Sequence, residues 1–374
     1  MVGLPRRHWM RLVAGSLLPM PLSVMAQTQG VRRRALAFPA DFGSHPDTQT
    51  EWWYATGWLA PATPGERPAE PTHGFQLTFF RSRTEVAADH PSAFAAKQLV
   101  FVHVALTDLT ERRQRHDQRI ARTGFGRADS VVGDTRVHLG DWQLRRSGAT
   151  TASRYDATVA SPALGGTLAL SMQTTQPLLL QGDAGYSRKG PGPAQASHYY
   201  SQPQLAVTAT LTPNGPGQPA RPLRGTAWLD HEWSDALLDR DAVGWDWIGI
   251  NLADGSALTA FRLRRADGSA LWAGGSWRAA GGAVRAFGPD EVRFTAQRVW
   301  ASPATGGRYP VQWLVETPAG RWTVRALLDA QELDSRGSTG TVYWEGLSEL
   351  LDAGRARVGL GYLEMTGYVG RLVL

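Results

Sequence analysis

The sequence predicts an all-β protein made of two tandem antiparallel β-barrel domains. Runs rich in Val, Leu, Thr and aromatic residues alternate with a period near two, as in EWWYATGWL (51–59) and QLVFVHVALTDL (98–109), which is typical of half-buried strands. The 41 Gly and 23 Pro residues are spread along the chain and suit many short elements joined by turns. A chain of 374 residues is long enough to bury two cores.

The first 26 residues have the composition of a signal peptide. RRHWMR is a basic region, LVAGSLLPMPLSV is apolar, and Val24-Met25-Ala26 offers a cleavage site. We therefore expect a periplasmic or secreted protein whose mature chain begins near Gln27. An uncleaved membrane anchor is the alternative, although the apolar run is short for a span and contains two prolines.

Composition excludes several classes of function. The chain has no Cys, so it has no disulfides, no thiolate nucleophile and no thiolate-bound zinc. Three Arg residues lie in the N-terminal segment, and the remainder has 36 basic and 33 acidic residues. This near balance gives no reason to expect a nucleic-acid partner.

The segment TPNGPGQPARP, 212–222, is the predicted linker because it is rich in Pro and Gly. It divides the chain into a first domain, 27–215, and a second, 216–374. Predicted strands in the second part include SALTAFRLR (256–264), EVRFTAQRVW (291–300) and RWTVRALL (321–328).

The two parts share a pattern that indicates duplication. HGFQLTFFRSR (73–83) and DGSALTAFRLR (254–264) both place Leu-Thr-x-Phe-Arg-x-Arg three residues after a glycine, at a constant offset of 181 residues. An aromatic strand precedes each, EWWYATGWL in one part and GWDWIGINL in the other. Matching strands in the same order favour one antiparallel barrel repeated, with chance similarity as the alternative.

DHEW, 230–233, is the first candidate site. On a strand His231 and Trp233 point to one face, and Asp230 and Glu232 to the other, since side chains alternate. HEWSD lacks the second His of the zincin motif, and the nucleophile elbow G-x-S-x-G is absent. We therefore expect neither a metal nor another cofactor.

Two further stretches place a carboxyl group among aromatics: Glu51 in EWWY and Asp246 in WDW. A carboxyl group in a dry aromatic interior has a raised pKa and can act as a general acid at neutral pH. If it protonated an alkene, the indole faces would stabilise the cation, and His231 or a second carboxylate would direct water onto it. In the alternative interpretation, the aromatics close the barrel floor and the acids pair with Arg.

The segment GDAGYSRKGPGPAQASHYYSQP, 182–203, is predicted to be a loop at a pocket mouth. It carries Lys189, His198, Tyr199 and Tyr200, which suit hydrogen bonding to a polar ligand group. A capping loop that shields a barrel end is the alternative.

Several motifs in order resemble the AttH-like family, which is grouped with carotenoid 1,2-hydratases of the CrtC type and often described as secreted hydrolases. They are HPDTQTEWWYATG, GYSRKG followed by SHYYS, TAWLDHEWS, GWDW and GLGYLEMTGY. The resemblance runs from about Phe38 to the C-terminus. It implies two lipocalin-like (calycin) barrels and a hydrophobic, often unsaturated ligand.

The resemblance also implies site residues. In the carotenoid hydratases, a His and a Trp two residues apart and an aromatic residue followed by Asp have been proposed for acid/base work. His231 and Trp233 match the first pair, and Asp246 is the nearest counterpart of the second. Including the residues beside these positions, the candidates for catalysis are His231, Asp246, Glu51, Asp230 and Glu232. Those for ligand binding are Trp52, Trp53, Tyr54, His198, Tyr199, Tyr200, Trp233, Trp245 and Trp247.

Three hypotheses follow for function. The first is a hydro-lyase acting on a polyene, isoprenoid or lipid, with Asp246 or Glu51 as acid and His231 as base. The second is a periplasmic carrier of a hydrophobic metabolite that works beside a membrane transporter, in which the same aromatics only line a cavity. The third, hydrolysis, rests on the family description alone.

Overall fold

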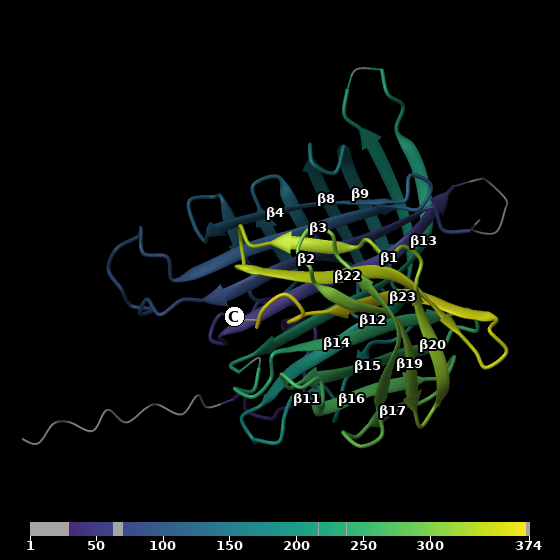
Figure 1. Ribbon diagram of the computed structural model, residues 1–374. Coiled ribbons are helices and arrows are strands. Elements are labelled where there is room, and N and C mark those ends of the chain that lie inside the picture. The colour runs from purple at the N-terminus through teal and green to yellow at the C-terminus, as the bar shows by residue number, and fades with distance from the viewer. Residues whose placement is uncertain (1–29, 63–69, 216, 237, 372–374) are drawn as a thin grey trace, which may run out of the picture.

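The computed structural model describes residues 30–62, 70–215, 217–236 and 238–371. These residues form two large antiparallel sheets and one short 3-10 helix, η1 (Ala40–Phe42) (Figure 1). The predicted all-β fold is confirmed. The predicted signal peptide, 1–26, lies outside the described residues. None of the helices in the described ranges is long and apolar enough to cross a membrane.

The first sheet runs in the order β4-β3-β2-β1-β13-β12-β9-β8-β7-β6-β5, with β10 and β11 also paired to β12. It curls until β3 and β4 contact β6, which nearly closes a barrel. Its strands are β1 (Thr50–Pro61), β2 (His73–Arg83), β3 (Gln98–Asp108), β4 (Arg113–Arg122), β5 (Ala128–Ser130), β6 (Arg136–Leu139), β7 (Trp142–Ser147), β8 (Arg154–Ser161), β9 (Gly166–Gln173), β10 (Leu179–Leu180), β11 (Tyr186–Arg188), β12 (Ala196–Pro213) and β13 (Arg221–Ser234).

The second sheet runs in the order β17-β16-β15-β14-β23-β22-β20-β19-β18, with β21 also paired to β22. Its strands are β14 (Gly244–Leu252), β15 (Ala257–Arg264), β16 (Ala270–Arg278), β17 (Val284–Phe287), β18 (Arg293–Ala301), β19 (Arg308–Thr317), β20 (Gly320–Ala326), β21 (Glu332–Ser335), β22 (Thr341–Leu351) and β23 (Arg357–Met365).

The two sheets share one topology. In each, the first strand pairs on one side with the second strand and on the other with the last: β1 with β2 and β13, and β14 with β15 and β23. The strands matched in sequence, β1 with β14 and β2 with β15, occupy equivalent places. This agreement supports the duplication.

The linker prediction needs correction. The segment 212–222 includes the end of β12, at Pro213, and the start of β13, at Arg221, and these two strands pair with each other in the first sheet, so it does not separate the two sheets. The chain passes to the second sheet later, between Ser234 and Gly244. Pro, Gly and Asn serve hairpin turns as well as linkers, and composition alone did not distinguish them.

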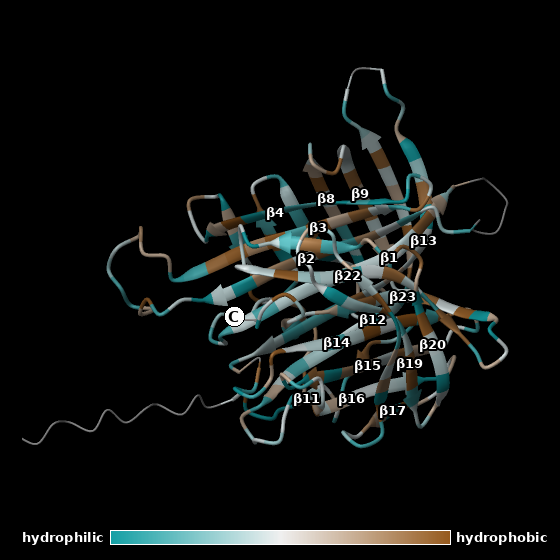
Figure 2. Cartoon of the chain, viewed as in Figure 1, coloured by the Kyte–Doolittle hydropathy of each residue, from teal (hydrophilic) through white to brown (hydrophobic). Residues whose placement is uncertain are grey.

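Apolar side chains gather in three main places, and Figure 2 shows them recurring along the strands of both sheets. One cluster fills the first barrel, one lies on the inner face of the second sheet, and a third lies between the two sheets. β1 serves two of them: Trp53 packs into the first barrel and Tyr54 into the layer between the sheets. The sheets approach closely at Gly74, where a Cβ would lie 2.7 Å from the Tyr362 hydroxyl.

Candidate functional site

A pocket lies between the two sheets and holds about 1070 Å³ of empty space, including open space at its mouth. The first sheet contributes β1, β2, β3 and β13, and the second contributes β14, β15, β22 and β23. Aromatic side chains make a large part of the lining: Trp52, Tyr54, Phe80, Phe101, Trp245, Trp247, Phe261 and Tyr343. A concave, mostly apolar site with a few polar groups is typical of small-molecule binding.

Strand alternation decides which side chains of β1 and β13 reach this pocket. On β1, Trp52 and Tyr54 line it, while Trp53 points into the first barrel. On β13, Asp230 and Glu232 line it, while the residues between and after them lie on the opposite face. The alternation predicted for DHEW is therefore observed.

Four carboxyl groups converge on the pocket. Asp230 and Glu232 come from β13, Glu345 from β22 and Glu364 from β23. Glu345 and Glu364 are directly opposed in the register of β22 and β23, which brings two like charges together. Opposed acids in a sheet repel each other when both are ionised.

Burial keeps three of these acids protonated at neutral pH or close to it. It raises the pKa of Asp230 to about 7. It raises the pKa of Glu345 well above its ordinary value, with the charge of Glu364 adding to the effect. It also raises the pKa of Glu364 to about 8. Desolvation disfavours the charged form of a carboxyl group, so the pocket holds carboxylic acids that can donate protons.

The acids on β13 are fixed by neighbours. Asp230 accepts hydrogen bonds from Ser201 (2.5 Å), the Trp228 indole (2.6 Å) and the Tyr199 hydroxyl (2.8 Å). Glu232 pairs with Lys189 at 2.9 Å and accepts a hydrogen bond from Ser197.

The acid on β22 is less constrained. Among the described residues, the buried Oε1 of Glu345 and the Tyr54 hydroxyl make no hydrogen bond of good geometry, although the two side chains are close enough to interact with each other. Burial and the charges of Glu345 and Glu364 raise the pKa of Tyr54 well above its usual value. A bound ligand could satisfy both atoms, because buried polar groups are normally hydrogen-bonded.

His103 on β3 also faces the pocket. Its ring nitrogens lie 2.7 Å from the Tyr343 hydroxyl and 2.7 Å from the Ser338 hydroxyl, so it links the two sheets. Burial lowers the pKa of His103 to about 3, and the ring is neutral at neutral pH.

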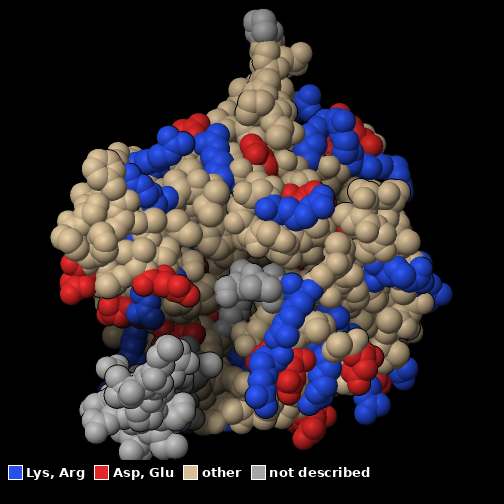
Figure 3. Space-filling model, turned by 60° about the vertical axis from the view of Figure 1, so that its left-hand side comes forward, with Lys and Arg blue, Asp and Glu red and all other residues tan. Residues whose placement is uncertain are grey.

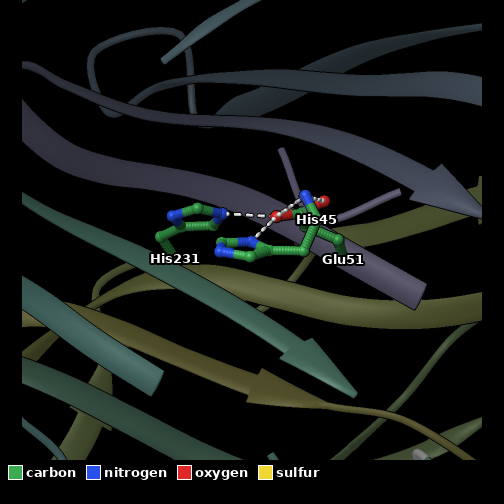
Figure 4. A group of neighbouring side chains, drawn as sticks. All are labelled: His45, Glu51 and His231. Carbon is green, nitrogen blue, oxygen red and sulfur yellow. Dashed lines mark hydrogen bonds and ion pairs between the residues drawn. The ribbon is translucent and has the colours of Figure 1, made fainter. Parts of the chain in front are cut away.

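Glu51 and His231 form a separate network on the opposite face of β1 and β13 (Figure 4). One Glu51 oxygen lies 2.8 Å from Nε2 of His231 and 2.7 Å from Nδ1 of His45, and the other accepts from Nε of Arg81 at 2.8 Å. Glu51 and His231 are both fully buried. Burial raises the pKa of Glu51, but hydrogen bonds from His231 and His45 outweigh it, so the net shift is downward.

The pKa values of the two histidines shift in opposite directions. Burial lowers the pKa of His231. Burial also lowers that of His45, but hydrogen bonds to Asp41 and Glu51 outweigh it and raise the net value. Glu51 is consequently a carboxylate that accepts hydrogen bonds from Arg81 and both imidazoles, which does not suit a proton donor. This corrects its predicted role as acid.

The same trio, His45, Glu51 and His231, is the group in the described residues that could offer a metal three ligand atoms, which lie within 4.8 Å of one another. Both imidazoles already point a nitrogen at one Glu51 oxygen, and Arg81 occupies the other. A cation would have to displace hydrogen bonds and face the Arg81 charge. The geometry therefore fits a hydrogen-bonded network better than a metal centre.

Asp246 lies outside the pocket lining, on the other face of β14 from Trp245 and Trp247. It lies on the second sheet between Arg262 (2.7 Å) and Arg264 (3.1 Å) and accepts from the Tyr368 hydroxyl at 2.8 Å. The neighbouring Trp245 and Trp247 do line the pocket. The placement of Asp246 matches the arginine-paired alternative and argues against its proposed role as acid.

The remaining predicted ligand residues divide between the faces. Tyr200 and Trp233 pack in a buried aromatic cluster with Phe42, and His198 bonds the backbone carbonyl of Arg32. Tyr199 reaches Asp230 from outside the pocket lining. Half of the predicted loop 182–203 lies in strands β11 and β12, and its Lys189 reaches the pocket.

Sequence reasoning missed Glu345, Glu364 and His103. Glu345 follows Tyr343-Trp344 in YWEG, the same mixture of aromatics and a carboxylate that singled out EWWY and WDW. Glu364 lies in GLGYLEMTGY, a motif quoted for its family likeness. Applying the aromatic-acid criterion to every strand would have found Glu345.

Comparison with known proteins agrees with this architecture. The model of the family described as AttH-like matches residues 29–368. The chain belongs to the AttH-like family. A crystal structure titled as an AttH from Nitrosomonas europaea is 46% identical, covers 91% of this chain and 99% of its own, and superposes with a TM-score of 0.80.

A more distant solved structure shares the fold. Kievitone hydratase from Nectria haematococca is 13% identical, covers 86% of this chain and 90% of its own, and gives a TM-score of 0.63. The likeness shows that the two proteins share a fold. A comparison with curated proteins gave no match.

Proposed function

We propose that this protein is a hydratase-like enzyme that binds a hydrophobic, unsaturated ligand between its two sheets and adds or removes water by acid/base catalysis. One observation carries the proposal: an aromatic pocket holds buried carboxyl groups whose pKa values are raised. A pure carrier has no need of such acids, which are unfavourable to bury.

Glu345 is the best-placed proton donor because it lines the pocket and its buried Oε1 makes no well-formed hydrogen bond among the described residues, with the Tyr54 side chain as its neighbour. Its proton would add to one carbon of a double bond, leaving a cation on the other. The faces of Trp52 and Trp247 would stabilise that cation. Water would then attack it and return a proton to the Glu345 carboxylate, so the acid is regenerated and the product is an alcohol. Dehydration is the reverse sequence.

Glu364 and Asp230 support this step. Glu364 opposes Glu345 across the strand pair and keeps its neighbour's pKa high. Asp230, fixed by three donors, would orient the attacking water. His231, behind the strand, holds β1 and β13 in register through Glu51.

A periplasmic carrier remains the second candidate. Its support is that the predicted acids Glu51 and Asp246 are both paired with Arg, as expected of structural groups. Either function is compatible with export through the predicted signal peptide, with a hydrophobic ligand and with a transporter partner. These three features belong to the proposal. The third hypothesis, hydrolysis, would need a positioned nucleophile, and nothing in the site favours it.

The test begins with protein purified from the periplasm of its source and analysed by native mass spectrometry for a bound hydrophobic molecule. That molecule is incubated with the wild type, with Glu345→Gln and with a surface control, Glu291→Gln. The proposal expects a mass change of one water with the wild type and the control, and at least a hundredfold slower change with Glu345→Gln. Unchanged recovery from all three proteins would establish the carrier.

A further inference from the structure

We propose that the pocket selects its ligand by charge: it accepts neutral and positively charged hydrophobic molecules and excludes anionic ones such as fatty acids. The inference rests on the proposed function, because it presumes that a ligand occupies the pocket. Charge selection of this kind narrows the substrate class to uncharged hydrocarbon-like molecules. A hydrophobic ammonium would then be a tight competitor, because it mimics the cation formed during the reaction.

The lining holds titratable acids but no unpaired basic side chain among the described residues. Four acids face the pocket, and among the described residues that line it the basic side chains are Lys189 and the neutral His103, with no arginine. Lys189 is already paired with Glu232. The outer surface differs, since basic and acidic side chains are both distributed over the face drawn in Figure 3. An anion entering the pocket would lose its hydration and meet no unpaired cation to offset that loss, whereas a neutral molecule needs none.

The aromatic lining favours the opposite charge. The negative face of an aromatic ring attracts cations within about 6 Å of its centroid. Lys189 already shows this arrangement, with its ammonium 4.7 Å from the Tyr199 ring and 4.4 Å from the Phe261 ring. Trp52, Trp245 and other rings of the lining offer further faces to a ligand.

The opposed acids add a second attraction. Glu345 and Glu364 stay protonated in the empty pocket because burial and mutual repulsion disfavour their charged forms. A ligand cation would favour ionisation of one of them, and a proton would leave as the cation binds. The other titratable groups facing them are Asp230, Glu232, Lys189, His103, Tyr54 and Tyr343, of which Asp230 would add to the effect.

The experiment compares three probes with one tail: decyltrimethylammonium, decan-1-ol and decanoate, each below its micellar concentration, by isothermal titration calorimetry at pH 7. The proposal expects the ammonium to bind tightest, the alcohol next, and decanoate at least tenfold more weakly than the alcohol. It also expects the ammonium to bind more tightly at pH 8.5 than at pH 6, while the alcohol shows no such gain.

Variants test whether the pocket acids cause the preference for the ammonium. Glu364→Gln and, separately, Glu345→Gln should reduce the preference for the ammonium over the alcohol, and the surface variant Glu291→Gln should not. Two variants are used so that a folding defect in one, detected by circular dichroism, leaves the other informative. Decanoate binding as tightly as the alcohol would overturn the charge inference while leaving ligand binding intact. No binding of any probe would instead count against the proposed function.

Discussion

Replacing Glu51 by Gln tests whether this residue has a structural role or is the acid suggested by its sequence. The change removes the charge that neutralises Arg81, whose side chain is 1% exposed, and leaves that guanidinium buried. Breaking a buried ion pair from one side costs about 3–5 kcal/mol. Arg81 keeps hydrogen bonds to Thr48 and Gln98, so we expect the lower end, about 3 kcal/mol.

The assay is equilibrium urea denaturation followed by Trp fluorescence at pH 7. The folded-state pKa of Glu51 is lowered from the ordinary 4.5, so its contribution is fully present above that value and is lost as pH falls below it. Asp183→Asn removes one member of an exposed pair with Arg33 and should change the free energy of unfolding by less than about 0.5 kcal/mol. A Glu51→Gln protein as stable as the wild type would refute this reasoning.

Three further predictions concern the pocket. Asp230 has its pKa raised to about 7, so the folded state binds more protons than the unfolded state between about pH 4 and 7. The contribution of Asp230 to the free energy of unfolding falls as pH rises through that window. Asp230→Asn should make the free energy of unfolding depend less on pH in denaturation series at pH 5 to 8. An unchanged pH dependence would contradict the raised pKa. Gly249→Ala would place a Cβ 2.3 Å from the Trp247 ring. We expect about 1–3 kcal/mol of destabilisation and weaker binding of decan-1-ol by calorimetry. Unchanged stability and unchanged decan-1-ol binding would show that the ring is free to move. His103 has its pKa lowered to about 3, so its ring signals in NMR should stay constant from pH 8 to 5, and titration near pH 6.5 would exclude the buried neutral ring.

The fold was predictable because it depends on local patterns. Period-two alternation identified β1, and the offset repeat identified β15 as the counterpart of β2. Alternation also placed Asp230 and His231 on opposite faces. These inferences need only neighbouring residues along one strand.

The site was harder to predict because it depends on pairing between distant strands. EWWY and WDW look alike in sequence and behave alike in the structure, because Glu51 pairs with Arg81 of β2 and Asp246 with Arg262 of β15, each on the neighbouring strand. Glu345 becomes notable only when β22 and β23 bring it opposite Glu364. Strand register across a sheet, and the packing of one sheet on another, are absent from a single sequence.

The division of the pocket acids has a consequence for the chain as a whole. Asp230 and Glu232 belong to the first sheet, and Glu345 and Glu364 to the second. A polypeptide cut between β13 and β14 would give two fragments, each of which exposes an apolar face that also carries acidic side chains. Such fragments would gain stability by reassembling, because neither carries the complete pocket. The two halves of the chain are therefore mutually dependent at this interface, since each supplies two of the four acids.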